Sequence, residues 1–106
     1  MIDIMLSSDL RGQRLDKNQA RKLVAKVVRE NPAGIYFTKH CLVELKKDDL
    51  TTSDVLNVLL SLDAKIVDQP EFERGSYKYR LGTKRIMTVL AFSSPSSLTV
   101  VTAWRK

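Results

Sequence analysis

Residues 76–104, SYKYRLGTKRIMTVLAFSSPSSLTVVTAW, decide the fold class, because strand-forming residues alternate through them with a period of two. Gly82-Thr83 predicts a tight hairpin turn, and residues 93–97 around Pro95 predict a looser one. Residues 86–92 are apolar on both faces except at Thr88, which predicts a central strand that helices cover on one side. Together with a run that begins at Ala64, the pattern predicts an antiparallel meander of four strands: 64–67, 76–81, 85–92 and 98–104.

The segment before the strands predicts helices. Asp16 and Gln19 have the spacing of a capping box, in which the two residues satisfy backbone amides at the start of a helix. The apolar residues behind them recur at the i, i+3, i+4, i+7, i+8 spacing of one buried helical stripe: Ala20, Leu23, Val24, Val27 and Val28. Asn31, Pro32 and Gly34 end this helix.

A short strand and two further helices are predicted next. Residues 35–37, IYF, are strand formers. Thr38 is placed to cap the second helix, which ends near Asp48-Asp49 and turns three residues inward: Cys41, Leu42 and Leu45. Thr51 and Asp54 repeat the capping signature before the third helix. We expect this helix to be mostly buried, because it is apolar around much of its circumference: Val55, Leu56, Val58, Leu59, Leu60 and Leu62.

These elements predict one domain. A chain of 106 residues is long enough for a single modest core. Residues 1–13 have no clear period and predict a tail or loosely attached arm, and residues 14–106 predict the domain itself. Helices followed by an antiparallel meander define an α+β fold, with N-terminal helices packed on one face of a four- to five-stranded, mainly antiparallel sheet.

Charge is distributed unevenly along the chain. All 12 acidic residues lie before residue 74, together with 11 of the 18 basic residues, so residues 74–106 carry seven cations and no carboxylate. Tyr77, Tyr79 and Trp104 lie among these cations. A basic sheet that carries aromatic residues suits a polyanion such as RNA or DNA. A face whose charge serves only solubility is the alternative.

Several function classes are excluded or disfavoured by composition. Cys41 is the only cysteine, which rules out an internal disulfide and fits a reducing cytoplasm. No apolar run approaches the roughly 20 residues that span a membrane, and no secretion signal is recognisable. One cysteine and one histidine cannot make a structural zinc site, and no glycine-rich phosphate loop is present. We therefore expect a cytoplasmic protein without metal or cofactor.

The order of short motifs between Lys22 and Lys106 resembles the bacterial messenger-RNA interferase toxins of the RelE/ParE-like superfamily, most closely the MqsR type, with features of BrnT-like relatives. Lys22-Leu23-Val24 resembles the "KLV" of the first helix, and residues 38–62 resemble its "T..A……D..NVI..L" segment. Residues 77–81, YKYRL, resemble a "YRPRL" strand, and residues 104–106, WRK, resemble the closing residues. His40 resembles the histidine of the BrnT-like "FT.HA" start.

The resemblance implies a RelE/ParE-like fold, a metal-independent endoribonuclease activity and a cognate antitoxin as protein partner, besides RNA, including ribosome-associated messenger RNA. It places the catalytic tyrosine at Tyr77, the final lysine at Arg105 and the first lysine at Lys65. The glutamine of the family falls near Arg74, and a guanidinium cannot act as an amide does because it only donates hydrogen bonds. Arginine in place of the final lysine keeps the charge but holds its proton more strongly.

The residues themselves offer a set of catalytic candidates. Metal-independent cleavage needs a base, an acid and cations that stabilise the phosphate. His40 can move a proton near neutral pH, although it can equally bond a neighbouring loop. Tyr77 can do so only if cations lower its pKa from about 10; otherwise it packs or stacks on a base. Arg80 and Arg105 are the preferred phosphate clamps, with ion pairs to Asp68, Glu71 or Glu73 as the alternative.

The remaining basic and aromatic residues of this region are predicted to contact RNA: Arg74, Lys78, Tyr79, Lys84, Arg85 and Lys106. Solubility of the hairpin turn is the alternative for Lys84 and Arg85, and it is the favoured one for Lys84. Strand alternation raises a conflict, because Lys78 and Arg80 share one face while Tyr77 shares the other with the apolar Leu81. A non-catalytic module that binds nucleic acid or protein is therefore kept beside the endoribonuclease. A protein-interaction domain with a merely solubilising charge is the third hypothesis.

Overall fold

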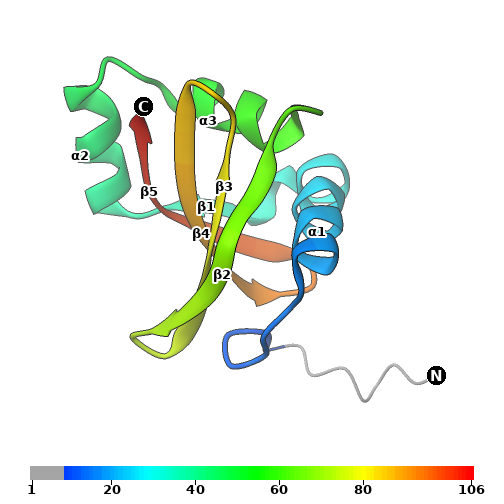
Figure 1. Cartoon of the computed structure of the whole chain (residues 1–106). Helices are drawn as coiled ribbons and strands as arrows, with labels where there is room; N and C mark the ends of the chain where they lie inside the picture. The colour runs from blue at the N-terminus through cyan, green and yellow to red at the C-terminus, as the bar shows by residue number, and fades with distance from the viewer. Residues whose placement is uncertain (1–8) are drawn as a thin grey trace.

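A five-stranded mixed sheet organises the chain in the computed structural model, which describes residues 9–106 (Figure 1). The strand order is β1-β5-β4-β3-β2, in which β1 runs parallel to β5 and every other neighbouring pair is antiparallel. The strands are β1 (Ile35–Phe37), β2 (Lys65–Glu73), β3 (Ser76–Gly82), β4 (Ile86–Ser94) and β5 (Ser97–Arg105).

Three α-helices lie before β2 in the described part of the chain: α1 (Lys17–Glu30), α2 (Lys39–Lys47) and α3 (Thr52–Leu60). The 3-10 turn η2 (Pro32–Gly34) ends α1, and β1 follows it. The α+β class is therefore confirmed, and the helices-first order holds only in part because β1 separates α1 from α2. None of the helices described in residues 9–106 has the length and apolarity needed to cross a bilayer.

The predicted capping signals are present as hydrogen bonds. Asp16 accepts from the Gln19 amide at 2.8 Å while the Gln19 side chain accepts from the Asp16 amide at 3.0 Å. Thr51 and Asp54 repeat this capping box at α3. The Thr38 hydroxyl accepts from the Cys41 amide at the start of α2 and donates to the Val101 carbonyl of β5. Short-range sequence signals thus set where all three helices begin.

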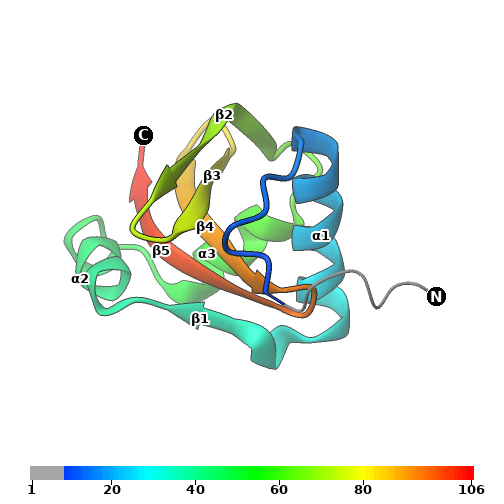
Figure 2. The ribbon, with the colours of Figure 1, turned by 90° about the horizontal axis from the view of Figure 1, so that it is seen from below.

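The core lies between one face of the sheet and the helices. Figures 1 and 2 show α1 beside β2 and α2 beside β5. The largest fully buried side chains come from α1, α3 and strands β3 to β5: Tyr79, Phe92, Leu59, Leu81, Leu90, Leu98, Val24, Val27, Val55 and Val100. Three leucines that the sequence predicts to face inward are exceptions: Leu42 of α2, which is 46% exposed, and the two last leucines of the predicted third helix. Leu60 is 48% exposed and Leu62 is 99% exposed, because α3 ends at Leu60 and Leu62 lies in the following turn.

β2 is longer than the sequence predicts. It continues past Val67 to Glu73 through a break in register between Val67 and Glu71, where Asp68 takes a φ of 59°. Pro70 lies within this stretch, which is possible because β2 is an edge strand and needs no donor on its outer side. The two-residue turn into β3 is made by Arg74 and Gly75, both with positive φ (50° and 84°).

The chain ahead of α1 is attached to the sheet. The Leu10 amide donates to the Ser93 carbonyl, the Tyr77 amide to the Arg11 carbonyl, and the Leu15 amide to the Tyr79 hydroxyl. Leu10 and Leu15 are buried in the core. Leu10, Arg11 and Leu15 thus attach the chain ahead of α1 to the sheet, and residues 1–8 of the predicted tail or arm lie outside the described residues.

Candidate polyanion-binding cleft

A hollow of about 650 Å³ lies where β2 begins, β5 ends and the β3–β4 turn closes. Four of its lining residues are cations that come from three distant parts of the chain: Lys65, Lys84, Arg85 and Lys106. The other lining residues are Leu62, Asp63, Val67, Gly82 and Thr83. We call this hollow the basic cleft. It gathers four of the eleven residues that the sequence proposes for catalysis or RNA contact.

Backbone pairing places the cations of the basic cleft. Lys65 opens β2 and lies opposite Gly82 of β3. The β3–β4 turn closes through a bond from the Thr83 amide to the Ile86 carbonyl, and the Thr83 hydroxyl accepts from the Arg85 amide. The Lys106 amide donates to the Arg85 carbonyl, and its ammonium donates to the Thr83 carbonyl at 2.9 Å. These bonds attach the end of β5 to the β3–β4 turn, so Lys106 is held beside the turn that carries Lys84 and Arg85.

Gly82 lets the turn approach β4 closely. A Cβ atom at this position would lie 2.9 Å from the Ile86 carbonyl oxygen and 2.9 Å from the Met87 sulfur. Such contacts are shorter than a side chain tolerates without a shift of its neighbours. The glycine is therefore part of what holds Thr83, Lys84 and Arg85 at the rim of the basic cleft.

The cleft is electropositive. Lys65, Lys84, Arg85 and Lys106 are exposed, and among residues 9–106 none of them forms a salt bridge. Asp63 is the single acidic side chain of the lining. Several positive charges around one concavity raise the local concentration of anions. Arg85 can hold two phosphate oxygens at once through its guanidinium, and the lysines act as point charges.

Tyr79 does not face an RNA-binding surface, which corrects the sequence-based expectation. Its ring is 2% exposed and packs against Phe92, with ring centroids 5.4 Å apart. Its hydroxyl accepts from the Leu15 amide at 2.9 Å and donates to the Gln13 carbonyl at 3.3 Å. Burial raises the pKa of this phenol above its ordinary value. Tyr79 is a core residue that fixes the chain ahead of α1.

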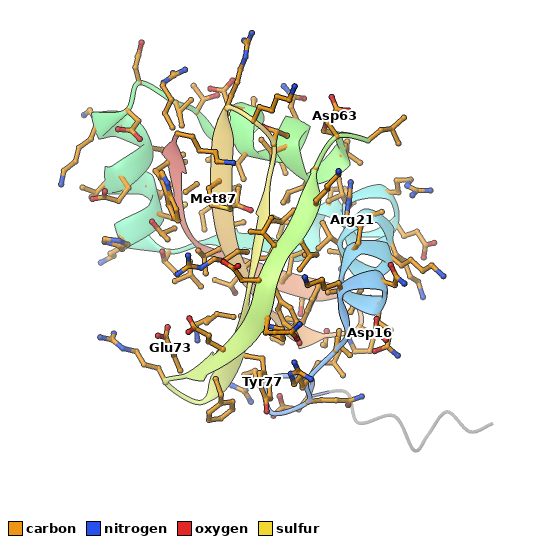
Figure 3. The ribbon with its side chains drawn as sticks, in the orientation of Figure 1. Asp16, Arg21, Asp63, Glu73, Tyr77 and Met87 are labelled. Carbon is orange, nitrogen blue, oxygen red and sulfur yellow. The ribbon has the colours of Figure 1, made fainter. Side chains whose placement is uncertain are left out.

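Tyr77 lies far from the basic cleft. It is partly buried on the same side of β3 as Tyr79 and Leu81, and its ring meets Phe72 edge-on at 5.1 Å between centroids. Figure 3 shows Tyr77 near one end of the β2–β3 hairpin and Asp63, which lines the cleft, near the other. The conflict raised by strand alternation is therefore real: Tyr77 and Arg80 point to opposite faces.

Arg80 and its neighbours occupy a separate surface. Arg80 is exposed and lines a hollow of about 380 Å³ with Asp68, Gln69, Pro70 and Glu71, so two carboxylates surround it. The Lys78 ammonium donates to the Glu73 carbonyl at 2.6 Å and to the Ser76 hydroxyl at 2.7 Å. Arg74 lies in the turn beyond them. Arg74 and Lys78 therefore lie toward the β2–β3 turn, whereas Arg80 pairs with Val67, a lining residue of the basic cleft, but lines the neighbouring acidic hollow.

Arg105 and His40 both belong to the surroundings of α2. The Arg105 amide donates to the Asp48 carboxylate at 2.7 Å, and its guanidinium donates to the Asp48 carbonyl at 3.1 Å. Arg105 thus satisfies groups at the C-terminal end of α2, a partner that the sequence did not suggest. His40 is an exposed residue of the first turn of α2. The structure therefore does not bring Tyr77, Arg80, Arg105 and His40 together.

Sequence reasoning missed Leu62, Asp63 and Thr83 as cleft residues. Leu62 continues the apolar run of α3, and only the chain direction after the helix end turns it outward. Within residues 9–106, no group of three or more His, Cys, Asp and Glu side chains is placed to hold a metal ion. Comparison of the chain with protein-family models, curated proteins and solved structures gives no significant match.

Proposed function

We propose that the protein binds single-stranded RNA through the basic cleft. The observation that carries the proposal is the gathering of Lys65, Lys84, Arg85 and Lys106 around one hollow, without a salt bridge among the described residues. A flexible strand can place successive phosphates in a concave site, and cation contacts supply most of the affinity of such binding. The choice of RNA over other polyanions follows from the resemblance of the sequence to RNA-cleaving toxins.

The test is a titration of a labelled single-stranded RNA of about 12 nucleotides, followed by fluorescence anisotropy from low to physiological salt. In Lys84→Ala/Arg85→Ala, we expect weaker binding and a slope of log K against log salt that is less steep by about 1.4, since each lost contact removes about 0.7 for single strands. The matched control is Lys39→Ala/Arg74→Ala, which removes two exposed cations outside the cleft. Equal slopes for wild type and the cleft variant would refute the proposal.

A metal-independent endoribonuclease of the RelE/ParE-like type is the second candidate. It is favoured by one observation: Lys65, which the resemblance assigns to catalysis, lines the same hollow as the proposed phosphate-binding cations. Cleavage there would rely on Lys65 and its cationic neighbours, because Tyr77 lies at the other end of the hairpin. A RelE/ParE-like fold, a cytoplasmic location and neutralisation by a cognate antitoxin belong to this candidate.

Product formation separates the two candidates. The RNA is incubated with protein in the presence of EDTA, with and without translating ribosomes, and cut sites are mapped by primer extension. Discrete cuts that Lys65→Ala abolishes while RNA binding persists would establish the nuclease. Retained RNA without cuts in either setting would leave the binding module as the function. Cuts that persist in Lys65→Ala would move catalysis elsewhere.

A further inference from the structure

A second basic hollow, of about 550 Å³, adjoins the basic cleft. Its cations come from α1 and lie on one side of that helix: Arg21, Lys22, Lys26 and Arg29. Glu30 is its single carboxylate, and Ala25, Leu62 and Ala64 complete the lining. We call it the α1 hollow. The sequence gives no hint of this arrangement, because α1 precedes the acid-free segment by more than 40 residues.

Leu62 lines both hollows and stands between them. Its side chain is 99% exposed, the highest exposure of any large apolar residue in the described chain. The loop that carries it is held on both sides: the Arg21 guanidinium donates to the carbonyls of Leu59, Ser61 and Ala64. The position of Leu62 is therefore set by hydrogen bonds. Single exposed apolar residues are common, but this one projects from a fastened loop between two groups of cations.

The cations of the α1 hollow differ in their availability. Arg21 is committed to its three carbonyl contacts, and burial lowers its pKa. Lys22, Lys26 and Arg29 are exposed and follow one another at i, i+4 and i+7, which places them in a row along α1. None of the three forms a salt bridge within residues 9–106. The α1 hollow thus offers three further cations to an anionic ligand.

We infer that the two hollows form one continuous track in which a single RNA strand crosses Leu62. Phosphates on either side of the crossing contact the cations of the basic cleft and of the α1 hollow, and a base packs against the Leu62 side chain. Proteins that bind the minor groove of duplex DNA insert apolar side chains, leucine among them, between base steps, and an unpaired base offers the same apolar surface to Leu62. The inference rests on the proposed function and extends the bound strand beyond the basic cleft.

The arrangement fits a nucleic acid strand better than an acidic protein. A nucleotide chain alternates phosphates with bases at a short interval. Two phosphates with a base between them therefore match the two cation-lined hollows with Leu62 between them. A protein partner would be expected to insert an apolar anchor into a pocket. Here the apolar group protrudes from this protein, and both hollows beside it are lined by cations.

The test compares RNA single strands of about 4 and about 12 nucleotides in the anisotropy titration. In Lys26→Ala/Arg29→Ala, we expect the salt slope for the longer strand to become less steep by about 1.4, with the shorter strand unaffected. In Leu62→Ala, we expect the longer strand to bind about tenfold more weakly at every salt concentration, with an unchanged slope, because the lost contact is apolar. Lys39→Ala/Arg74→Ala serves as the control for both variants.

The outcomes separate this inference from the proposed function. If both lengths bind and neither variant changes binding of the longer strand, the inference is wrong and the cleft proposal stands. If neither length binds at low salt, both are wrong. If an oligoglutamate peptide binds with dependence on Leu62 while RNA does not bind, the track is a protein-docking surface, which also overturns the inference. Circular dichroism of each variant confirms folding, and Leu62 is too exposed for its truncation to disturb the core.

Discussion

The hydroxyl group of Tyr79 joins two parts of the chain that are 64 residues apart. It accepts the buried amide of Leu15 and donates to the Gln13 carbonyl. We expect Tyr79→Phe to lower the free energy of unfolding by about 1–2 kcal/mol, because the Leu15 amide loses its acceptor inside the protein. Urea unfolding measures the change. Tyr36→Phe is the control: its side chain is 59% exposed, and its loss should stay within about 0.5 kcal/mol. Equal effects of the two substitutions would contradict the assignment.

Cys41 is a free, fully buried thiol whose pKa is raised by burial from 9.0 to about 11. We expect the folded protein to react very slowly with a thiol reagent near pH 8 and the urea-unfolded chain to react rapidly, because only the exposed thiolate attacks. Rapid labelling of the folded protein would show that Cys41 is accessible.

The raised pKa of Cys41 predicts that the protein becomes less stable as the pH rises into the alkaline range. Between about pH 9 and pH 11 the unfolded chain has lost the Cys41 proton that the folded protein still holds, so the free energy of unfolding falls as pH rises through this window. The raised pKa of Tyr79 acts in the same direction. Urea midpoints near pH 8 and pH 10 measure the fall, and Cys41→Ala should make it smaller.

At the scale of elements, the β2–β3 turn contains a position where the backbone conformation restricts which residue fits. Gly75 has a φ of 84°, and a Cβ atom there would meet no atom within 4 Å. We expect Gly75→Ala to lower the free energy of unfolding by about 1 kcal/mol purely through backbone strain. Gly12→Ala is a matched control, since it has equal space and no positive φ, and should be neutral or slightly stabilising. A similar loss at both glycines would point to another cause.

The sequence predicts the helices and strands better than the contacts between them, because its signals join residues that are close together in the chain. Asp16–Gln19, Thr38–Cys41 and Thr51–Asp54 are contacts three residues apart, so their spacing is visible in the chain. The alternation of side chains along β3 also correctly predicts that Lys78 and Arg80 lie on one face of the strand and Tyr77 on the other. The parallel pairing of β1 with β5, by contrast, joins Tyr36 to Thr99 and leaves no local signal.

The candidate site was predictable only in part for the same reason. The cations of the C-terminal third were identified, but their grouping depends on tertiary contacts. Arg105 turns to the carbonyl of Asp48, 57 residues away, whereas Lys106 turns to Thr83. Two adjacent basic residues thereby serve different surfaces. Leu62 was expected in the core because it continues an apolar run, and the early end of α3 places it outside.

On the scale of the whole molecule, the formal net charge of +6 raises the question of whether position or total charge governs binding to polyanions. Lys65 of the basic cleft is the first of the nine residues of β2 and Arg74 follows the last, so about 25–30 Å of extended chain separates them. This separation exceeds the Debye length of about 8 Å at physiological ionic strength.

Charge reversal in the basic cleft and in the β2–β3 turn distinguishes position from total charge. Lys84→Glu in the basic cleft and Arg74→Glu in the far turn change the net charge equally. At physiological salt we expect Lys84→Glu to weaken RNA binding strongly and Arg74→Glu to have little effect, because the distant charge is screened. At about 0.01 M ionic strength the Arg74→Glu effect should grow as the Debye length reaches about 30 Å. Equal losses at physiological salt would mean that net charge alone governs binding.

The attachment of residues 9–15 to the sheet has a consequence for synthesis of the chain. These residues leave the ribosome before the rest of the domain, yet Arg11 bonds to Tyr77, Leu15 to Tyr79 and Leu10 to Ser93. Their amides and carbonyls therefore remain hydrogen-bonded to water until β3 and β4 have been translated. The start of the described chain is made among the first segments and bonded among the last, so a chain whose synthesis stops before residue 77 would lack the strands that hold Leu10, Arg11 and Leu15.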